Sequence, residues 1–237
     1  MSDFINTVDV LGDEAVTNSI IDKTIKEYSD NNVSWIESHV FHGCASLTSV
    51  SFPVVTSVGT NAFQNCTSLT SVSFPVATYL GGYAFHSCRS LTSVNFPAVT
   101  SVGTNAFYSC RSLTSVSFPV ATYIGSSAFY SCTSLTSVSF PVATYIGSNA
   151  FCKCDSLLSV DFPAATSIGS SAFYGCTSLA TLYLSGSSVC TLTAANAFMN
   201  TLLYDGLGSI FVPASLVSSY KTATNWTLYS NQIFATP

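Results

Sequence analysis

The sequence predicts a mainly β protein, a solenoid of 22-residue coils with short parallel strands and helical caps at both ends. Three observations predict it. A nearly constant unit recurs every 22 residues through most of the 237-residue chain. Each unit contains a short stretch in which apolar and hydroxyl side chains alternate, and each carries a proline and a glycine at fixed positions. Self-similarity at a period of about 20–50 residues is the signature of stacked repeats.

Counted from its cysteine, the unit reads C-x-S-L-x-S-V-x-F-P-x-x-T-x-x-G-x-x-A-F-x-x. In S-V-x-F the valine and the phenylalanine fall on one side of an extended chain, so both are expected to point into the core from a short strand. The proline ends that strand because it has no N–H to donate. A second extended piece, T-x-I or T-x-V, is expected across the coil. We expect the glycine to occupy a corner with positive φ.

A coil of this kind cannot bury its apolar side chains alone, so stability is expected to arise between stacked neighbours. Residues 22–184 are predicted to form the solenoid, with a degenerate first coil over 22–43. Stepping back by 22 residues places Tyr28 in the Val slot and Phe41 in the Ala-Phe slot.

Both ends of the array need caps. Residues 1–21 are predicted to form an N-terminal cap with a short helix over 12–21, which is acidic at its start and apolar later. Residues 185–237 are predicted to hold an irregular last coil, a strand at 209–213 and a capping helix at 214–222.

Seven of the nine cysteines recur at the 22-residue period, which leaves metal binding, disulfides or a buried thiol column as explanations. Metal sites need ligands at closer spacings, and parallel side chains on neighbouring rungs rarely meet disulfide geometry. We therefore favour a column of small, buried, reduced thiols. Cys190 is expected in the Val/Ile slot that follows Ile168. Cys152 lies outside the column and is the best candidate for an exposed thiol.

Charge is scarce, at 7% of residues against about 25% in ordinary soluble proteins. Eight of the eleven acidic residues precede residue 38, and no basic patch exists to attract nucleic acid. No apolar run approaches the roughly 18 residues of a membrane span, and no signal peptide is visible. We expect no membrane insertion, no cofactor and no metal. The sequence also lacks a recognisable catalytic motif, so no catalytic residue and no enzyme activity are predicted.

Three sets of side chains are candidates for ligand binding. Hydroxyl and amide residues flank the valine of each first strand, tyrosines share a slot on adjacent coils, and two arginines share another. These candidates are Ser71, Ser73, Ser93, Asn95, Ser115, Ser117, Ser137, Ser139, Tyr123, Tyr145, Arg89 and Arg111. Each set has a plainer explanation: solubilising residues on a sheet, tyrosines that shield one another, and splayed, solvated arginines.

The string V-G-x-x-A-F-x-x-C-x-S-L-T-S-V-x-F-P resembles the BspA-like leucine-rich repeats of bacterial surface proteins. The ending similarly resembles the terminal module V-P-x-x-x-V-x-x-Y-K-x-A-x-N-W that closes such arrays. The resemblance implies a curved, non-catalytic leucine-rich-repeat solenoid at the cell surface or outside the cell, which binds a glycan or a protein in adhesion or host interaction.

Two other functions remain open. The first is a structural or assembly protein, including one of phage origin, in which the repeats act as a spacer. The second is ice binding through the regular Ser/Thr ranks, against which the mixture of Ser, Asn and Asp argues.

Overall fold

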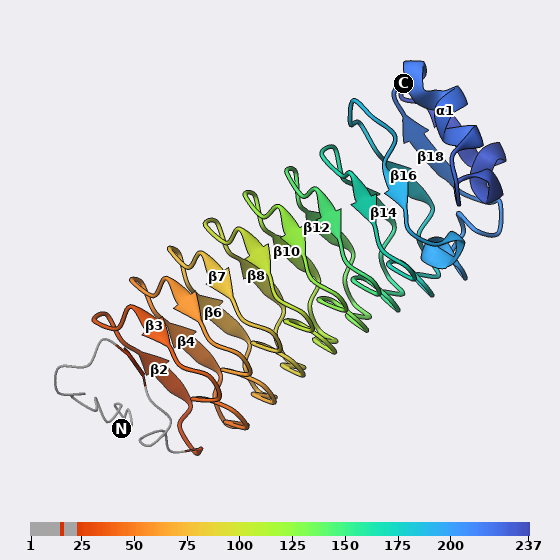
Figure 1. Cartoon of the computed structure of the whole chain (residues 1–237). Coiled ribbons are helices and arrows are strands. Elements are labelled where there is room, and N and C mark those ends of the chain that lie inside the picture. Colours follow the sequence, from red (N-terminus) through yellow and green to blue (C-terminus); the bar gives the residue numbers. More distant parts are fainter. Residues whose placement is uncertain (1–14, 17–22) are drawn as a thin grey trace.

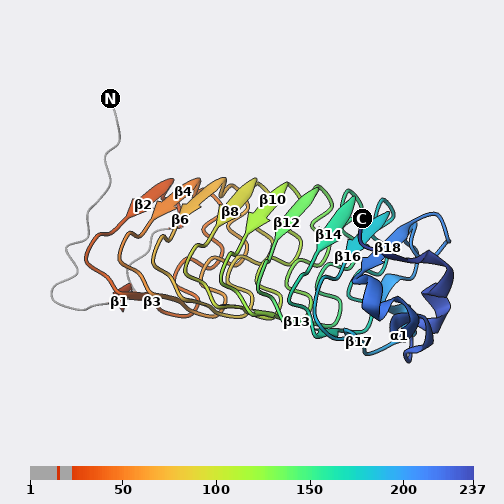
Figure 2. The same ribbon diagram turned by 90° about the horizontal axis from the view of Figure 1, so that it is seen from above.

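The computed structural model describes Ala15–Val16 and residues 23–237. The coils stack into an elongated body, with the first coils at one end and the only α-helix of the described residues, α1 (Val217–Thr222), at the other (Figures 1 and 2). Each regular coil contributes one three-residue strand and one two-residue strand, on opposite sides of the stack. The chain is therefore a mainly β, parallel-strand solenoid, as predicted.

The three-residue strands carry the alternating S-V-S sequence. They are β2 (Glu27–Ser29), β4 (Ser49–Ser51), β6 (Ser71–Ser73), β8 (Ser93–Asn95), β10 (Ser115–Ser117), β12 (Ser137–Ser139), β14 (Ser159–Asp161) and β16 (Thr181–Tyr183), which are followed by β18 (Ser209–Val212) and β19 (Ile233–Ala235). In the strands from β2 to β16 the central residue points inward and the flanking residues point outward, because side chains alternate along a strand. In β18 the buried residues are Ile210 and Val212, and in β19 the buried residue is Ile233.

The two-residue strands form one continuous nine-stranded parallel sheet on the opposite side. They are β1 (Ala15–Val16), β3 (Trp35–Ile36), β5 (Ser57–Val58), β7 (Tyr79–Leu80), β9 (Ser101–Val102), β11 (Tyr123–Ile124), β13 (Tyr145–Ile146), β15 (Ser167–Ile168) and β17 (Thr191–Leu192). The first coil continues this register, because Tyr28 pairs with Val50 and Ile36 pairs with Val58.

The three-residue strands divide into separate sheets, β2-β4-β6, β8-β10-β12 and β14-β16-β18-β19. At the two junctions between these sheets the phenylalanine rings that follow the three-residue strands are further apart. The rings of Phe74 and Phe96 are 6.0 Å apart and those of Phe140 and Phe162 are 6.4 Å apart, against 5.3 Å for Phe118 and Phe140 within a sheet. The first strand after each junction carries a larger polar residue, Asn95 or Asp161, where most other coils have serine.

Two columns of stacked phenylalanine rings run through the core. In the Ala-Phe column, consecutive rings from Phe41 to Phe198 lie 4.8–5.3 Å apart and nearly parallel. The second column follows the three-residue strands and meets the first edge-to-face, as between Phe118 and Phe129. All these rings are fully buried, so the prediction that phenylalanines align inside the stack is confirmed.

The glycine column is explained by close packing and not by positive φ, so that expectation was wrong. A Cβ on Gly125 would lie 2.7 Å from the carbonyl carbon of Gly103 and from the amide nitrogen of Thr104, in the preceding coil. The left-handed conformation occurs instead at two other positions in most coils, such as Ser127 and Ser131. The glycine therefore lets the backbones of successive coils approach each other.

The cysteine column forms the buried thiol ladder that was predicted, and all nine cysteines are free and buried. From Cys66 onward, each thiol in the column donates a hydrogen bond to a phenylalanine carbonyl of the preceding coil, such as Cys110 to Phe85 at 3.1 Å. Threonine hydroxyls link the coils in the same way, as from Thr144 to the carbonyl oxygen of Thr122 at 3.2 Å. These donors satisfy backbone oxygens that lie between the coils.

Two cysteine predictions were wrong. Cys152 is buried, with 3% of its surface exposed, because it is smaller than the Tyr130 and Tyr174 that occupy its position on either side. Cys190 does not follow Ile168, since that place is taken by Leu192 after a two-residue insertion. Cys190 instead lies beneath the C-terminal cap, where its amide donates to the Tyr220 hydroxyl at 2.9 Å.

The C-terminal segment closes the core with large side chains. The 3₁₀ helix η2 (Ala214–Leu216) runs into α1, and η3 (Thr227–Gln232) follows. The indole of Trp226 is fully buried and donates to the carbonyl oxygen of Cys190 at 2.7 Å. The strand β19 was not predicted; it extends the last sheet by pairing with β18.

The segment 185–208 keeps more of the coil than was expected. It retains β17 and the 3₁₀ helix η1 (Ala195–Phe198), whose Phe198 continues the ring column at 5.3 Å from Phe173. At the other end, Ala15–Val16 is a strand paired with β3 and not part of a helix. The remainder of the predicted N-terminal capping helix lies outside the described residues.

Candidate functional site

The serine-rich columns lie on the outward side of the three-residue strands. Register pairing aligns Ser93, Ser115 and Ser137 in one row, and Asn95, Ser117 and Ser139 in a parallel row. Their side chains are exposed or half-exposed. Ser71 and Ser73 continue the same two rows but belong to the preceding sheet, across the first junction.

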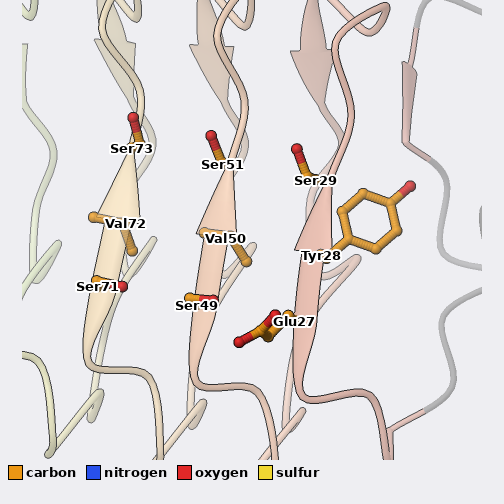
Figure 3. A pocket seen from close by; sticks show the side chains of 9 residues that line it. All are labelled: Glu27, Tyr28, Ser29, Ser49, Val50, Ser51, Ser71, Val72 and Ser73. Atoms are coloured by element: carbon orange, nitrogen blue, oxygen red, sulfur yellow. The ribbon is translucent and has the colours of Figure 1, made fainter. Parts of the chain in front are cut away.

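A shallow depression of about 280 Å³ lies over β2, β4 and β6 (Figure 3). Its floor is formed by the central residues Tyr28, Val50 and Val72. Two hydroxyl rows border the floor, Ser49 with Ser71 and Ser29 with Ser51 and Ser73. The exposed Glu27 begins the first row and is the one charged side chain among the residues that line the depression.

The depression includes Ser71 and Ser73 from the candidates named above, and it adds residues that were not among them. Glu27 and Tyr28 were missed as site residues although the repeat phase reveals them, because stepping back 22 residues from Ser49 and Val50 reaches them. Chemically, hydroxyls around a small apolar floor suit a ligand that itself presents hydroxyls and C–H groups.

Tyr123 and Tyr145 lie on the opposite sheet, in β11 and β13. Their rings are parallel and stacked, with centroids 5.0 Å apart and an interplanar angle of 3°. They occupy a row of the nine-stranded sheet whose members are, in order, Trp35, Ser57, Tyr79, Ser101, Tyr123, Tyr145, Ser167 and Thr191. We call this the aromatic row. Its members Trp35 and Tyr79 were not among the candidate residues named from the sequence.

A second aromatic stack follows the Ala-Phe segments. His86, Tyr108 and Tyr130 stack at centroid separations of 4.9 and 4.7 Å, and Lys153 lies 5.8 Å from the centre of the Tyr130 ring. Desolvation lowers the pKa of His86, which favours a neutral imidazole. A hydrogen bond with Tyr130 raises the pKa of Lys153, so this exposed ammonium stays charged. The rings cover one another's faces and leave mainly their edges to a partner.

Arg89 and Arg111 are exposed and lie in the turns that precede β8 and β10. They are thus near the start of the strands that carry Ser93 and Ser115, and across the core from the tyrosines. The predicted residues therefore form two separate candidate surfaces, and one small ligand cannot contact both.

Metal and membrane sites were also considered for the part of the chain that the structure describes. No group of three or more His, Cys, Asp or Glu side chains lies close enough there to hold a metal ion. Within the same residues, every helix is too short or too polar to cross a bilayer.

Comparison with known proteins gives a consistent result. A model of the BspA type leucine rich repeat region, with 6 copies, matches residues 10–122 and 100–223. No curated protein matches the chain.

Several solved structures are similar. A leucine-rich repeat protein of T. pallidum is 33% identical, with a TM-score of 0.58 over 62% of this chain and 72% of that one. A leucine-rich repeat protein from Bacteroides ovatus is 17% identical, with a TM-score of 0.44 over 90% of this chain and 92% of that one. A third, from Eubacterium ventriosum, is 18% identical, with a TM-score of 0.47 over 80% and 66% of the two chains.

Proposed function

Because the chain belongs to the BspA-type leucine-rich repeat family, whose repeats imply an interaction or adhesion role, we propose that it is a non-catalytic binding protein. Its partner is a glycan or a hydroxyl-rich protein surface. The observation that carries the proposal is the pair of hydroxyl rows that border the depression over β2, β4 and β6.

The chemistry of this surface supports an uncharged partner. Between Gly43 and Cys152 the chain contains only two charged residues, Arg89 and Arg111, and among the residues that line the depression only Glu27 is charged. Away from the Glu27 end this surface offers little electrostatic attraction, so recognition there depends on hydrogen bonds and on contact with C–H groups. The hydroxyl rows repeat at the spacing of the coils, about 4.8 Å, which suits a partner that is itself repetitive or extended.

The test is a glycan array together with a pull-down from host and bacterial surface material, each performed with the whole chain and two variants. Ser73→Tyr fills the depression with a side chain that the same column already carries as Tyr183 in β16. Ser139→Tyr makes the same change in the same column, outside the depression.

We expect Ser73→Tyr to weaken binding at least tenfold and Ser139→Tyr to retain it. Equal loss in both variants would place the binding surface elsewhere on the sheet. If the unaltered chain binds nothing in either assay, the binding proposal fails and the spacer function becomes the better explanation.

A further inference from the structure

The aromatic row contains a notch that is one coil wide. Ser101 pairs in register with Tyr79 on one side and with Tyr123 on the other, so two tyrosines two coils apart are separated by a serine. The strand spacing of about 4.8 Å places these two rings roughly 9.6 Å apart. Two coils earlier, Ser57 lies in the same way between Trp35 and Tyr79.

The exposure of the rings follows from these neighbours. Tyr79 has a serine on both sides and is 50% exposed, whereas Tyr123 has one serine and one stacked tyrosine and is 41% exposed. Tyr145, stacked on Tyr123, is only half-exposed. The ring faces that border Ser57 and Ser101 are thus open to a ligand, unlike the faces within the Tyr123–Tyr145 pair.

The coil that carries Ser101 is also small at a second position. Three residues before the aromatic row, the coils on either side present exposed valines, Val76 and Val120, while this coil has Ala98. The coil that carries Ser101 therefore has smaller side chains than its two neighbours at both of these coil positions.

The width of the notch distinguishes between possible occupants. Carbon atoms in contact lie about 3.5–4.0 Å apart, so a flat aromatic ring held between two ring faces spans about 7 Å. A puckered pyranose ring with axial hydrogens is thicker and fits roughly 9.6 Å better. The surroundings contain hydroxyl groups, including those of Ser101 and Thr100. The two charged residues between Tyr79 and Tyr123, Arg89 and Arg111, lie in the turns that precede β8 and β10, away from the aromatic row.

We propose that the Tyr79–Ser101–Tyr123 notch holds one pyranose ring of a neutral glycan, with a C–H face against each tyrosine and Ser101 as a hydrogen-bond partner. The Trp35–Ser57–Tyr79 position holds the next accessible ring along the same axis. This inference rests on the proposed binding function but places the contact on the opposite sheet from the depression.

The decisive variant is Ser101→Tyr, which fills the notch and converts the row into a continuous stack. It is compatible with folding because the next two coils already carry tyrosine at this position, 5.0 Å apart. Ser167→Tyr is the matched control: it adds the same side chain at the same coil position, beyond Tyr145, and leaves the notch open. Tyr79→Ala and Tyr83→Ala form a second pair, since Tyr83 is 39% exposed but lies outside the row.

Binding is measured by isothermal titration with cellohexaose, chitohexaose and laminarihexaose as probes. We expect at least one probe to bind the unaltered chain, with affinity reduced at least tenfold by Ser101→Tyr and by Tyr79→Ala. Ser167→Tyr and Tyr83→Ala should change it less than twofold. Thermal unfolding of each variant confirms that loss of binding is not loss of fold.

Two results with the glycan probes would overturn the notch assignment. One is that none of the three neutral probes binds. The other is that binding is insensitive to Ser101→Tyr. In the second case, loss in Ser73→Tyr would leave the proposed binding function intact and assign it to the depression. Loss of a protein partner alone in Ser101→Tyr would also contradict a pyranose site.

Discussion

At the scale of the residue, the glycine column shows how little space separates one coil from the next. Its members are held in place by contact with the backbone of the preceding coil, and backbone atoms cannot move aside as a flexible side chain can. Each coil therefore has room for the hydrogen side chain of glycine at this position but not for the methyl group of alanine. Core positions of this kind tolerate added volume poorly.

Gly125→Ala is expected to lower the free energy of unfolding by about 3 kcal/mol, because the new Cβ would meet three backbone atoms at 2.7 Å. Urea denaturation followed by circular dichroism measures the change. The matched control is Gly186→Ala, whose Cβ would have no neighbour nearer than 3.5 Å and which should stay within about 0.5 kcal/mol. Similar stability for the two variants would contradict the close-packing explanation.

The sequence revealed which residues recur, but not always why. It correctly assigned Phe, Leu and Cys to the interior because their apolar character leaves few other places for them. For glycine the pattern is the same whether the cause is positive φ or a close approach between chains, so only the structure distinguishes the two. Cys152 was misplaced because its burial depends on the larger Tyr130 and Tyr174 beside it, and not on its own polarity.

At the scale of the element, the junctions after β6 and β12 are the places where neighbouring coils are least connected. The amides of Phe52 and Phe118 donate to the next coil at 3.0 and 3.1 Å. Among the described residues, the equivalent amides of Phe74 and Phe140 make no such bond. The nine-stranded sheet on the other side remains continuous and holds the coils together there.

Amide hydrogen exchange should therefore be about tenfold faster at Phe74 and Phe140 than at Phe52 and Phe118, since the latter pair must break a hydrogen bond before exchanging. All four amides have the same neighbours, Ser before and Pro after, so their intrinsic exchange rates are matched. Residue-resolved exchange by NMR measures the difference. Equal protection at all four sites would show that the junctions are closed in solution.

The strands were predicted from the alternation in S-V-S, and their register from the 22-residue period. The division into three sheets was not, because the repeats on both sides of a junction are nearly identical. The candidate serines were correctly expected to face outward. The depression and the notch could not be predicted as such, since each depends on which side chains several successive coils bring together.

At the scale of the whole molecule, the thiol column makes stability depend on pH. Burial raises the pKa of Cys66 and Cys110 in this column to about 12, from an ordinary value of 9.0, and it does the same for Cys190 beneath the C-terminal cap. Below pH 9 these thiols are protonated in both states. Between pH 9 and 12 the unfolded chain loses protons that the folded chain keeps, so the folded state is progressively disfavoured.

The free energy of unfolding should fall above pH 9 by about 1.4 kcal/mol per thiol for each pH unit. Denaturation midpoints between pH 8 and 11, measured under reducing conditions, follow this decline. Replacing Cys66 and Cys110 by alanine removes two of the responsible groups. The unfolding free energy of this double variant should fall less steeply with pH, by about 2.8 kcal/mol for each pH unit, which corresponds to two protons. An unchanged slope in the double variant would contradict a role for the thiols.

The near-identity of the interfaces between successive coils has a consequence for the evolution of the gene. The rings of Phe107 and Phe129 stack at 5.3 Å and those of Phe129 and Phe151 at 5.2 Å, so removal or duplication of a whole coil joins surfaces that already match. Unequal recombination within such a gene yields proteins with different numbers of coils that still fold. Loss of a few codons inside a coil, even in frame, disrupts the stacking and prevents folding. Selection can thus adjust the length of the molecule in steps of one repeat while its sides keep the same chemistry.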